Sequence, residues 1–546
     1  MAIRDVRAAG LRRVAVRSPG FVALACALYL AVGAVATWPA IRHADRAFLA
    51  EGAPGYGEVA PGDHLQTAYR LWLAGHQLEN GRAPWRDPYT FRPEAGPQIN
   101  LQGWPFGLPY WPLAAAFDAA RAWNIFILLT YVAAGGLACA WLRALGLPRG
   151  AALVGGAAFA VAPYRVAQST GHLLGPISVL LPAALLGLER ARSGRWGWLV
   201  VAAAALASIP LSGQVHLALG ALALFLGYAA VRARERTLLA GAAVAAAAAA
   251  AVGLVVERMV IQESVVAGGR SLGAVRFYSA SWLDFVSRDA DRGLERFVFL
   301  GWITPVAAVV GLGLLLRARR FWLAGLLGLA ALLPILLSLG TNLPLYESLW
   351  RSFSPFRYAR VPERLMPVAC LALAALVAFA VEKLRWRLAP LVVGALLLAD
   401  LHVDVVKASA DDPANAAYAS LRGALPGRLL ELPVFLPDRH YGSVYHRYAM
   451  QAPRERPGGY STLAPPAADA LARRLRPLNC GDWGSGREAL LRRLEVRHVA
   501  FHQGLYAGNP LVPRRCANVA RRALVRHGFR LLARDGAVTL YVRSDV

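Results

Sequence analysis

Residues 364–387 read RLMPVACLALAALVAFAVEKLRWR, an apolar run followed at once by a cluster of basic residues. A helix needs about 20 apolar residues to cross a bilayer. Basic residues resist translocation, so short loops rich in Lys and Arg stay in the cytoplasm. This stretch therefore predicts a transmembrane helix that ends on the cytoplasmic side.

The same combination recurs through the first 407 residues. Apolar runs lie near residues 21–39, 122–142, 150–165, 171–189, 196–211, 214–231, 237–256, 297–316, 321–340, 364–382 and 388–406. After the first outer loop, every second gap holds a basic cluster: Arg143 with Arg149; Arg190, Arg192 and Arg195; Arg232, Arg234 and Arg236; Arg317, Arg319 and Arg320; Lys383, Arg385 and Arg387. The first run follows Arg4, Arg7, Arg12, Arg13 and Arg17 and has no small-residue cleavage site, so it predicts an uncleaved span. About eleven spans place the N-terminus in the cytoplasm and the C-terminus outside.

Composition agrees with a membrane protein and excludes several function classes. The chain is 57% hydrophobic and carries a net charge of +26. Much of that charge lies in the short gaps between apolar runs, where membrane orientation explains it, so we expect no nucleic-acid partner. No P-loop, GxGxxG after a strand, HExxH or paired CxxC occurs, which argues against a nucleotide-driven motor and a zinc enzyme. The Arg-rich and Ala-rich composition indicates a bacterial protein, and the spans indicate the inner membrane.

The predicted domains are a membrane domain, 1–407, with outer loops at 41–121, 257–296 and 341–363, and an extracytoplasmic α/β domain, 408–546. Asp411-Asp412-Pro413 reads as a linker. Alternation predicts strands at 428–435, 496–501, 529–533 and 538–542, with helices near 465–477, 486–495 and 517–527. Cys480 and Cys516 could form a disulfide if this region lies outside the cytoplasm. The fold class is thus a polytopic α-helical membrane protein with a small C-terminal α/β domain.

Asp63 opens a helical pattern that runs to Glu79 in the first outer loop. Its apolar residues recur at helical spacing, so we expect an amphipathic helix along the membrane surface. A carboxylate here has two interpretations. Asp63 with Gln66 fits a capping box, and an outer-face carboxylate can also act as general base on an acceptor hydroxyl.

The late outer loop holds four arginines, Arg351, Arg357, Arg360 and Arg364. This violates the charge rule that the other short loops obey, and an anionic ligand at the membrane surface would offset the violation. The guanidinium group binds phosphate in a bidentate manner. If the loop is helical, the last three share one face. The alternative is pairing with anionic lipid headgroups or with Glu347 and Glu363.

Other polar residues lie at the predicted outer ends of spans. Arg165 and His172 bracket one outer turn, and Gln214 and His216 begin another span. Polar residues at such positions are functional candidates, although a single His is more often a packing residue. The acidic residues of 284–295 alternate with Arg and read as a solvated loop.

Short motifs occur in a defined order: Gly62-Asp63-His64; Pro355-Phe356-Arg357 with Pro362-Glu363-Arg364; Leu430-Glu431-Leu432-Pro433; Gly459-Tyr460-Ser461; and Pro465-Pro466. With them the chain resembles the type C glycosyltransferases, which use polyprenyl-phosphate sugars, and more narrowly the bacterial YfhO-like membrane proteins. The resemblance implies that Asp63 is the catalytic base. In the wider class a second acidic residue often stands beside the base, where this chain has His64.

The resulting hypothesis is transfer of a sugar from a polyprenyl-phosphate donor to a cell-envelope glycan, lipid or protein on the outer face. Asp63 would take the acceptor proton, and Arg357, Arg360 and Arg364 would bind the donor phosphate, with His64, Arg165, His172 and His216 lining the site. The donor carries its own energy, so no nucleotide is expected, and dependence on a divalent metal stays open. The alternatives are a lipid-linked sugar transporter or flippase, and a non-catalytic envelope-assembly protein with the same fold.

Overall fold

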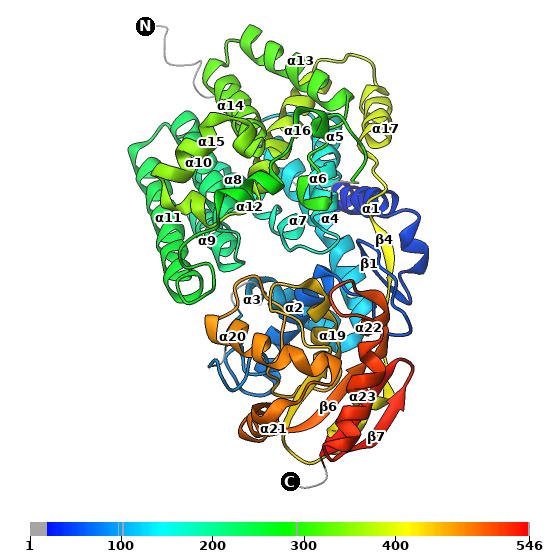
Figure 1. Cartoon of the computed structure of the whole chain (residues 1–546). Helices are drawn as coiled ribbons and strands as arrows, with labels where there is room; N and C mark the ends of the chain where they lie inside the picture. Colours follow the sequence, from blue (N-terminus) through cyan, green and yellow to red (C-terminus); the bar gives the residue numbers. More distant parts are fainter. Residues whose placement is uncertain (1–18, 97, 101–102, 291–292, 544–546) are drawn as a thin grey trace, which may run out of the picture.

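The computed structural model describes residues 19–543 except 97, 101–102 and 291–292, so the arginines before Pro19 lie outside the described residues. A helical bundle occupies one end of the molecule and an α/β domain the other (Figure 1). Helices α2 and α3 lie between the two (Figure 1). The predicted architecture, a multi-pass helical protein with a C-terminal α/β part, is confirmed.

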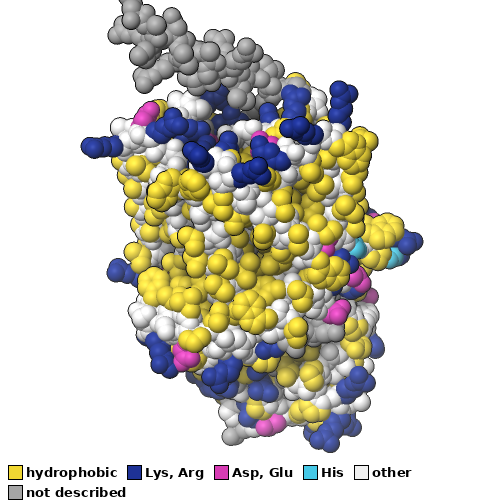
Figure 2. Space-filling view, turned by 90° about the horizontal axis from the view of Figure 1, so that it is seen from above, with side chains coloured by type: hydrophobic (Ala, Val, Ile, Leu, Met, Phe, Trp, Pro, Cys, Tyr) yellow, Lys and Arg dark blue, Asp and Glu magenta, His cyan; other side chains and the backbone are white. Residues whose placement is uncertain are grey.

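Helices occupy the positions of all the predicted apolar runs. They are α1 (Pro19–Ala36), α4 (Ala119–Ala144), α5 (Arg149–Ala160), α8 (Leu180–Arg192), α9 (Trp198–Leu211), α10 (Val215–Arg232), α11 (Arg236–Val256), α13 (Ile303–Arg317), α14 (Phe321–Ser338), α16 (Met366–Glu382) and α17 (Ala389–Leu401). Within the described residues, 7 helical segments are long and apolar enough to cross a membrane, and α9, α13 and α17 are shorter apolar helices. Figure 2 shows the broad band of hydrophobic side chains that results, with Lys and Arg side chains gathered at one border.

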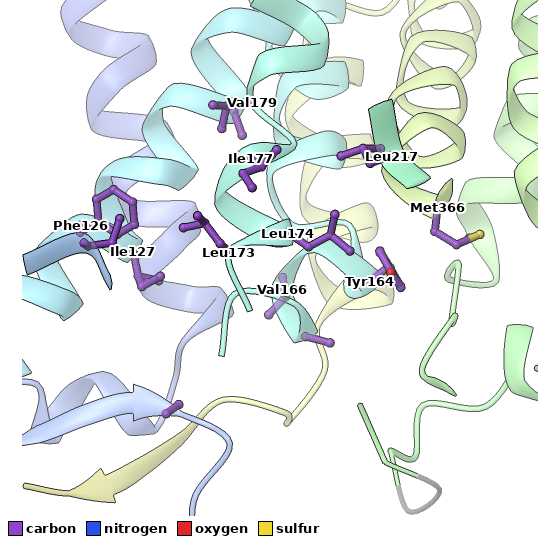
Figure 3. Close-up of a cluster of buried hydrophobic side chains, with 14 of the residues drawn as sticks. Phe126, Ile127, Tyr164, Val166, Leu173, Leu174, Ile177, Val179, Leu217 and Met366 are labelled. Carbon is purple, nitrogen blue, oxygen red and sulfur yellow. The ribbon is translucent and has the colours of Figure 1, made fainter. Parts of the chain in front are cut away.

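Two predicted spans are interrupted. The run at 150–165 stops at Ala160, because the residue before Pro163 disfavours helical geometry, and Pro163 then begins the short helix α6 (Pro163–Ala167). The run at 171–189 divides into α7 (Leu174–Ile177) and α8. These breaks place Tyr164, Val166, Leu173, Leu174 and Ile177 in a buried cluster with side chains from α4, α10 and α16 (Figure 3). The turn that carries His172 is therefore packed against a buried apolar cluster.

Contacts inside the bundle agree with the alternation of basic clusters. Arg192 at the end of α8 and Arg232 at the end of α10 both bond the buried carboxylate of Glu189, with N–O distances of 2.9 and 2.6 Å. Two clusters that the charge rule assigns to the cytoplasm therefore meet on one side of the bundle. Helix α16, from the stretch 364–387, packs against α5, α13 and α14 and is buried along most of its length.

The loops that the sequence predicts to lie outside form short elements at the opposite end of the bundle helices. They are η1 (Ala40–His43), β1 (Ala47–Ala50), α2 (Asp63–Glu79), β2 (Arg86–Asp87), β3 (Gln98–Ile99), α3 (Trp104–Ala116), η2 (Glu257–Ile261), α12 (Leu272–Tyr278), η3 (Trp282–Phe285), η4 (Leu294–Arg296), η5 (Gly340–Asn342), α15 (Pro344–Ser352), η6 (Ser354–Arg357) and η7 (Pro362–Leu365). Helix α2 is buried between α3 and α19 (Ser443–Gln451) rather than lying along a surface as the sequence predicted. Its apolar face is covered by protein.

The C-terminal part is a four-stranded mixed sheet in the order β5-β6-β8-β7, with β5 parallel to β6 and the other pairs antiparallel. Its strands are β5 (Arg428–Leu432), β6 (Val496–His502), β7 (Phe529–Asp535) and β8 (Val538–Arg543), close to the predicted positions. The other elements are α18 (Ala416–Ala419), η8 (Ser420–Gly423), η9 (His440–Gly442), α20 (Pro466–Leu475), η10 (Arg476–Cys480), α21 (Gly484–Arg493), α22 (Gln503–Gly508) and α23 (Cys516–Arg526). Cys480 and Cys516 form a disulfide with a Cα–Cα distance of 4.4 Å.

The predicted linker is an ordered, buried connection. Strand β4 (Lys407–Ala410) pairs antiparallel with β1 of the first outer loop. Asp411 then accepts two hydrogen bonds from Arg447, and both side chains are at most 3% exposed. The burial of this connection was not predicted, because acidic residues beside a proline resemble a solvated turn until their partner is known. The pairing fixes the first outer loop against the C-terminal part of the chain.

Candidate functional site

Asp63 is held by two long-range hydrogen bonds. Tyr460 donates its hydroxyl to Oδ1 at 2.5 Å, and His172 donates Nε2–H to Oδ2 at 2.7 Å. The residue before α2 is Gly62, and no side chain caps the helix, so the capping-box prediction was wrong. Gln66 donates instead to the backbone carbonyl of Tyr460. The carboxylate is thus oriented by groups from two distant parts of the chain.

Both ring nitrogens of His172 face acceptor oxygens, Gln168 Oε1 and Asp63 Oδ2. Gln168 donates its amide to the carbonyl of Leu294 at 3.2 Å, which turns its Oε1 toward His172 Nδ1 at 2.9 Å. Nδ1 therefore donates to Gln168 while Nε2 donates to Asp63, which is the pattern of an imidazolium. Burial lowers the pKa of His172, but the hydrogen bond and charge of Asp63 outweigh burial, so its pKa is raised. Burial likewise opposes ionisation of Asp63, yet His172 and Tyr460 lower its pKa.

Tyr460 belongs to the Gly459-Tyr460-Ser461 motif of the C-terminal part. Its backbone N–H donates to His446 Nε2 at 3.2 Å. A Cβ at Gly459 would lie 2.9 Å from the ring of Phe91, so glycine is needed for the motif to approach the first outer loop this closely. Burial, followed by the charge of Asp63, raises the pKa of the Tyr460 hydroxyl, which therefore remains a donor.

A pocket opens beside Asp63 and is strongly cationic. Its empty volume is about 1140 Å³, including its open mouth, and its charged lining comprises two carboxylates, those of Asp63 and Glu295, with four arginines, Arg70, Arg270, Arg360 and Arg364. Glu295 Oε1 lies 3.1 Å from Arg360 and 3.7 Å from Arg364. Arg364 also donates to Gln214 at 3.0 Å. The four arginines outnumber the two carboxylates, so the lining is suited to an anion.

Two of the four arginines were not predicted. Burial lowers the pKa of Arg70 to about 10, and burial with the charges of Arg360 and Arg364 lowers that of Arg270 to about 10, so each stays charged at neutral pH. Arg70 follows Asp63 by two helical turns, so helical periodicity could have placed both on one face of α2. Arg270 follows two glycines in an irregular loop and gives no comparable signal.

Glu295 corrects the prediction of a solvated acidic loop. Its side chain is 17% exposed, and His172, Arg360 and Arg364 all lie within 4 Å of Oε1. The sequence places Glu295 among alternating acids and arginines, which is typical of a solvated face. Its burial depends on residues 65 positions or more away.

Five of the eight predicted site residues line the pocket: Asp63, His172, His216, Arg360 and Arg364. His216 is 4% exposed, and its ring lies edge-on to Phe356 with centroids 4.8 Å apart. The remaining three predicted residues lie behind the pocket or beside it.

His64, Arg165 and Arg357 do not line the pocket. The ring of His64 is buried against Phe48, with centroids 5.0 Å apart. Arg165 is 1% exposed and donates to the carbonyls of Ala160 and Thr130, both at 2.8 Å. It stabilises the interrupted spans.

Arg357 donates to the backbone carbonyls of Trp350 and Arg351 at 3.0 and 2.6 Å. The prediction of three arginines on one helical face was wrong. Pro355 and Pro362 lie at the starts of two separate 3₁₀ helices, η6 and η7, and the segment between them is not helical. Only Arg360 and Arg364 are brought together, on either side of Glu295.

No group of three or more His, Cys, Asp or Glu side chains able to hold a metal ion occurs among the residues that the structure describes. The site holds the ionised carboxylate of Asp63 beside an arginine-lined anion pocket. Such an arrangement can accept a proton at Asp63 and stabilise a phosphate that gains charge.

Comparison with solved structures identifies the fold. The mycobacterial arabinofuranosyltransferase AftD superposes with a TM-score of 0.61 at 16% identity, covering 97% of this chain and 40% of AftD. The oligosaccharyltransferase AglB from Archaeoglobus fulgidus, in complex with an inhibitory peptide and a dolichol-phosphate, superposes with a TM-score of 0.50 at 11% identity, covering 96% of this chain and 74% of AglB. This chain has the type C glycosyltransferase fold. No protein-family model and no curated protein sequence matches it.

Proposed function

We propose that the chain is an integral membrane glycosyltransferase that transfers a sugar from a polyprenyl-phosphate donor to a hydroxyl of a cell-envelope acceptor. The observation that carries the proposal is the ionised carboxylate of Asp63 at the edge of a pocket lined by Arg70, Arg270, Arg360 and Arg364. The shared fold with AftD and AglB supports it, and so does the dolichol-phosphate in the AglB complex.

In the proposed reaction, the acceptor oxygen bonds to the anomeric carbon of the sugar while the bond to the donor phosphate breaks. Asp63 takes the acceptor proton. Each of its oxygens accepts one hydrogen bond and keeps a second lone pair for the acceptor hydroxyl. The leaving phosphate gains negative charge, which Arg270, Arg360 and Arg364 stabilise at no cost of reorganisation because they are already positioned.

More narrowly, we place the chain with the YfhO-like membrane proteins of the bacterial inner membrane, with the pocket and the C-terminal α/β domain on the outer side. The alternation of basic clusters supports this orientation. The Cys480–Cys516 disulfide supports it too, since disulfides are stable in oxidising compartments and rare in the cytoplasm.

Mass spectrometry of cell-envelope glycans from a deletion strain tests the proposal. We expect one glycan species to disappear, a polyprenyl-phosphate sugar to accumulate, and both changes to be reversed by the wild-type gene. Detergent-solubilised membranes of the deletion strain should regain the glycan when purified protein is added. A flippase would give no such recovery, because detergent abolishes the barrier between the two sides of the membrane. Unchanged glycans in the deletion strain would exclude the proposed transfer.

A further inference from the structure

The C-terminal domain carries a second cationic surface, far from Asp63. A groove between α23 and β7 is lined by five arginines, Arg521, Arg522, Arg526, Arg530 and Arg534, and no acidic side chain is among its lining residues. All five are exposed. In Figure 1, α23 and β7 lie at the end of the molecule opposite the helical bundle. The groove therefore faces away from the membrane in which the bundle lies.

These five arginines differ from most others in the same domain. Arg428, Arg439, Arg473, Arg487 and Arg493 each lie within 4 Å of a carboxylate. The structure gives the groove arginines no such partner within its described residues. Like charges gathered in one concave surface repel one another and favour an anionic ligand.

The sheet geometry explains why the arginines converge. A register shift between Leu531 and Ala533 inserts one residue into β7, so Leu531 pairs with Tyr541 and Arg534 pairs with Thr539. Thr539 and Tyr541 point to the same face of β8, so Leu531 and Arg534 share that face. Burial raises the pKa of the Tyr541 hydroxyl, and the charges of Arg521 on α23 and Arg534 on β7 oppose that rise, so both arginines lie near this hydroxyl.

Apolar side chains lie between the charges. Val525 is 59% exposed and Leu531 is 62% exposed, and both line the groove. Cationic groups spaced by apolar side chains suit a ligand that alternates anionic groups with C–H surface. An acidic sugar polymer has this character, whereas an inorganic anion offers only charge.

We propose that this groove binds an anionic polysaccharide of the cell envelope. The arginines pair with its carboxylate or phosphate groups, and Val525 and Leu531 pack on the faces of its sugar rings. This binding is independent of the transfer reaction proposed above, because no residue of the groove lines the pocket at Asp63.

Binding of the full-length protein in detergent to immobilised polygalacturonate tests the proposal, with neutral dextran and polyphosphate as comparison polymers. The groove variant is R526Q/R530Q/R534Q. The matched control is R439Q/R473Q/R493Q, which removes the same charge from exposed, ion-paired positions of the same domain. We expect the groove variant to bind polygalacturonate at least about tenfold more weakly, the control to stay within about twofold of wild type, and dextran not to bind.

Leu531→Ala separates the two anionic ligand classes. It should weaken binding of polygalacturonate several-fold and leave binding of polyphosphate unchanged. An unchanged melting temperature of each variant shows that the substitutions leave the fold intact. Equal losses of polygalacturonate binding in the groove variant and in the control variant would show that the effect comes from net charge alone. Binding of polyphosphate but not of polygalacturonate by the wild type would exclude a polysaccharide ligand. Either result overturns the proposal.

Discussion

Replacement of Asp63 by Asn separates chemistry from folding. Asn keeps one acceptor oxygen for His172 Nε2–H, and its amide N–H can donate to the oxygen of the Tyr460 hydroxyl. The variant therefore exchanges hydrogen bonds to a charged carboxylate for weaker ones to a neutral amide, which costs about 1–2 kcal/mol of folding free energy. It also loses the general base, which contributes about 100-fold to 10,000-fold in rate. We expect normal membrane levels, with sugar transfer reduced by about 100-fold or more.

The assay is glycan recovery in the deletion strain, quantified by mass spectrometry, with binding of a polyprenyl-phosphate analogue measured in parallel. Asp118→Asn is the matched control, because Asp118 caps α4 by accepting from the Arg121 N–H at 2.9 Å and does not line the pocket. We expect full activity from this control and donor binding within a few-fold of wild type for Asp63→Asn. Transfer by Asp63→Asn within about twofold of wild type would refute the role of Asp63 as base and favour a non-catalytic assembly protein.

Three further predictions concern the pair at the site, the disulfide and the topology. The raised pKa of His172 and the lowered pKa of Asp63 mean that their pairing stabilises the fold fully between pH 3.8 and 6.5, the ordinary pKa values of the two groups. This stabilisation is lost as pH rises through the raised pKa of His172 or falls through the lowered pKa of Asp63. The melting-temperature difference between wild type and His172→Gln should therefore shrink at both ends of a pH series, and a constant difference would contradict the pairing. The double variant Cys480→Ser/Cys516→Ser opens a loop with a sequence separation of 36 and should lower the free energy of unfolding of the C-terminal domain by about 3–4 kcal/mol. Denaturant titration measures this change, and the wild type under reducing conditions should have the same free energy of unfolding as the double variant. Alkaline phosphatase fused to the C-terminal domain should be active. Fluorescence of a cytoplasmic reporter fused at the same place would show that this domain lies in the cytoplasm.

The membrane architecture could be predicted because hydropathy and charge are local signals. The run 364–387 contains both its apolar span and its basic end, and the structure gives helix α16 there. Strands β6 and β8 follow from local alternation in the same way. The interruptions of the spans were harder to predict, since the hydropathy of the run that Pro163 divides is that of a single helix.

The site was only partly predictable because its contacts are distant in sequence. Asp63 meets His172 across 109 positions and Tyr460 across 397. Without those partners, Asp63 reads as a helix cap. Glu295 reads as a solvated acid for the same reason, because its burial comes from Arg360 and Arg364. Arg70 is the exception, since its spacing from Asp63 on α2 was visible in the sequence.

If the arginine-lined pocket binds the phosphate of a polyprenyl lipid, replacement of Arg360 must weaken that binding. Affinity of a polyprenyl-phosphate analogue should be measured on purified wild type, Arg360→Lys and Arg360→Ala. Lys keeps the charge but loses the bidentate guanidinium, so we expect the Lys variant to bind more weakly than wild type, and the Ala variant more weakly still. Equal affinities across the three proteins would show that the phosphate does not bind at Arg360.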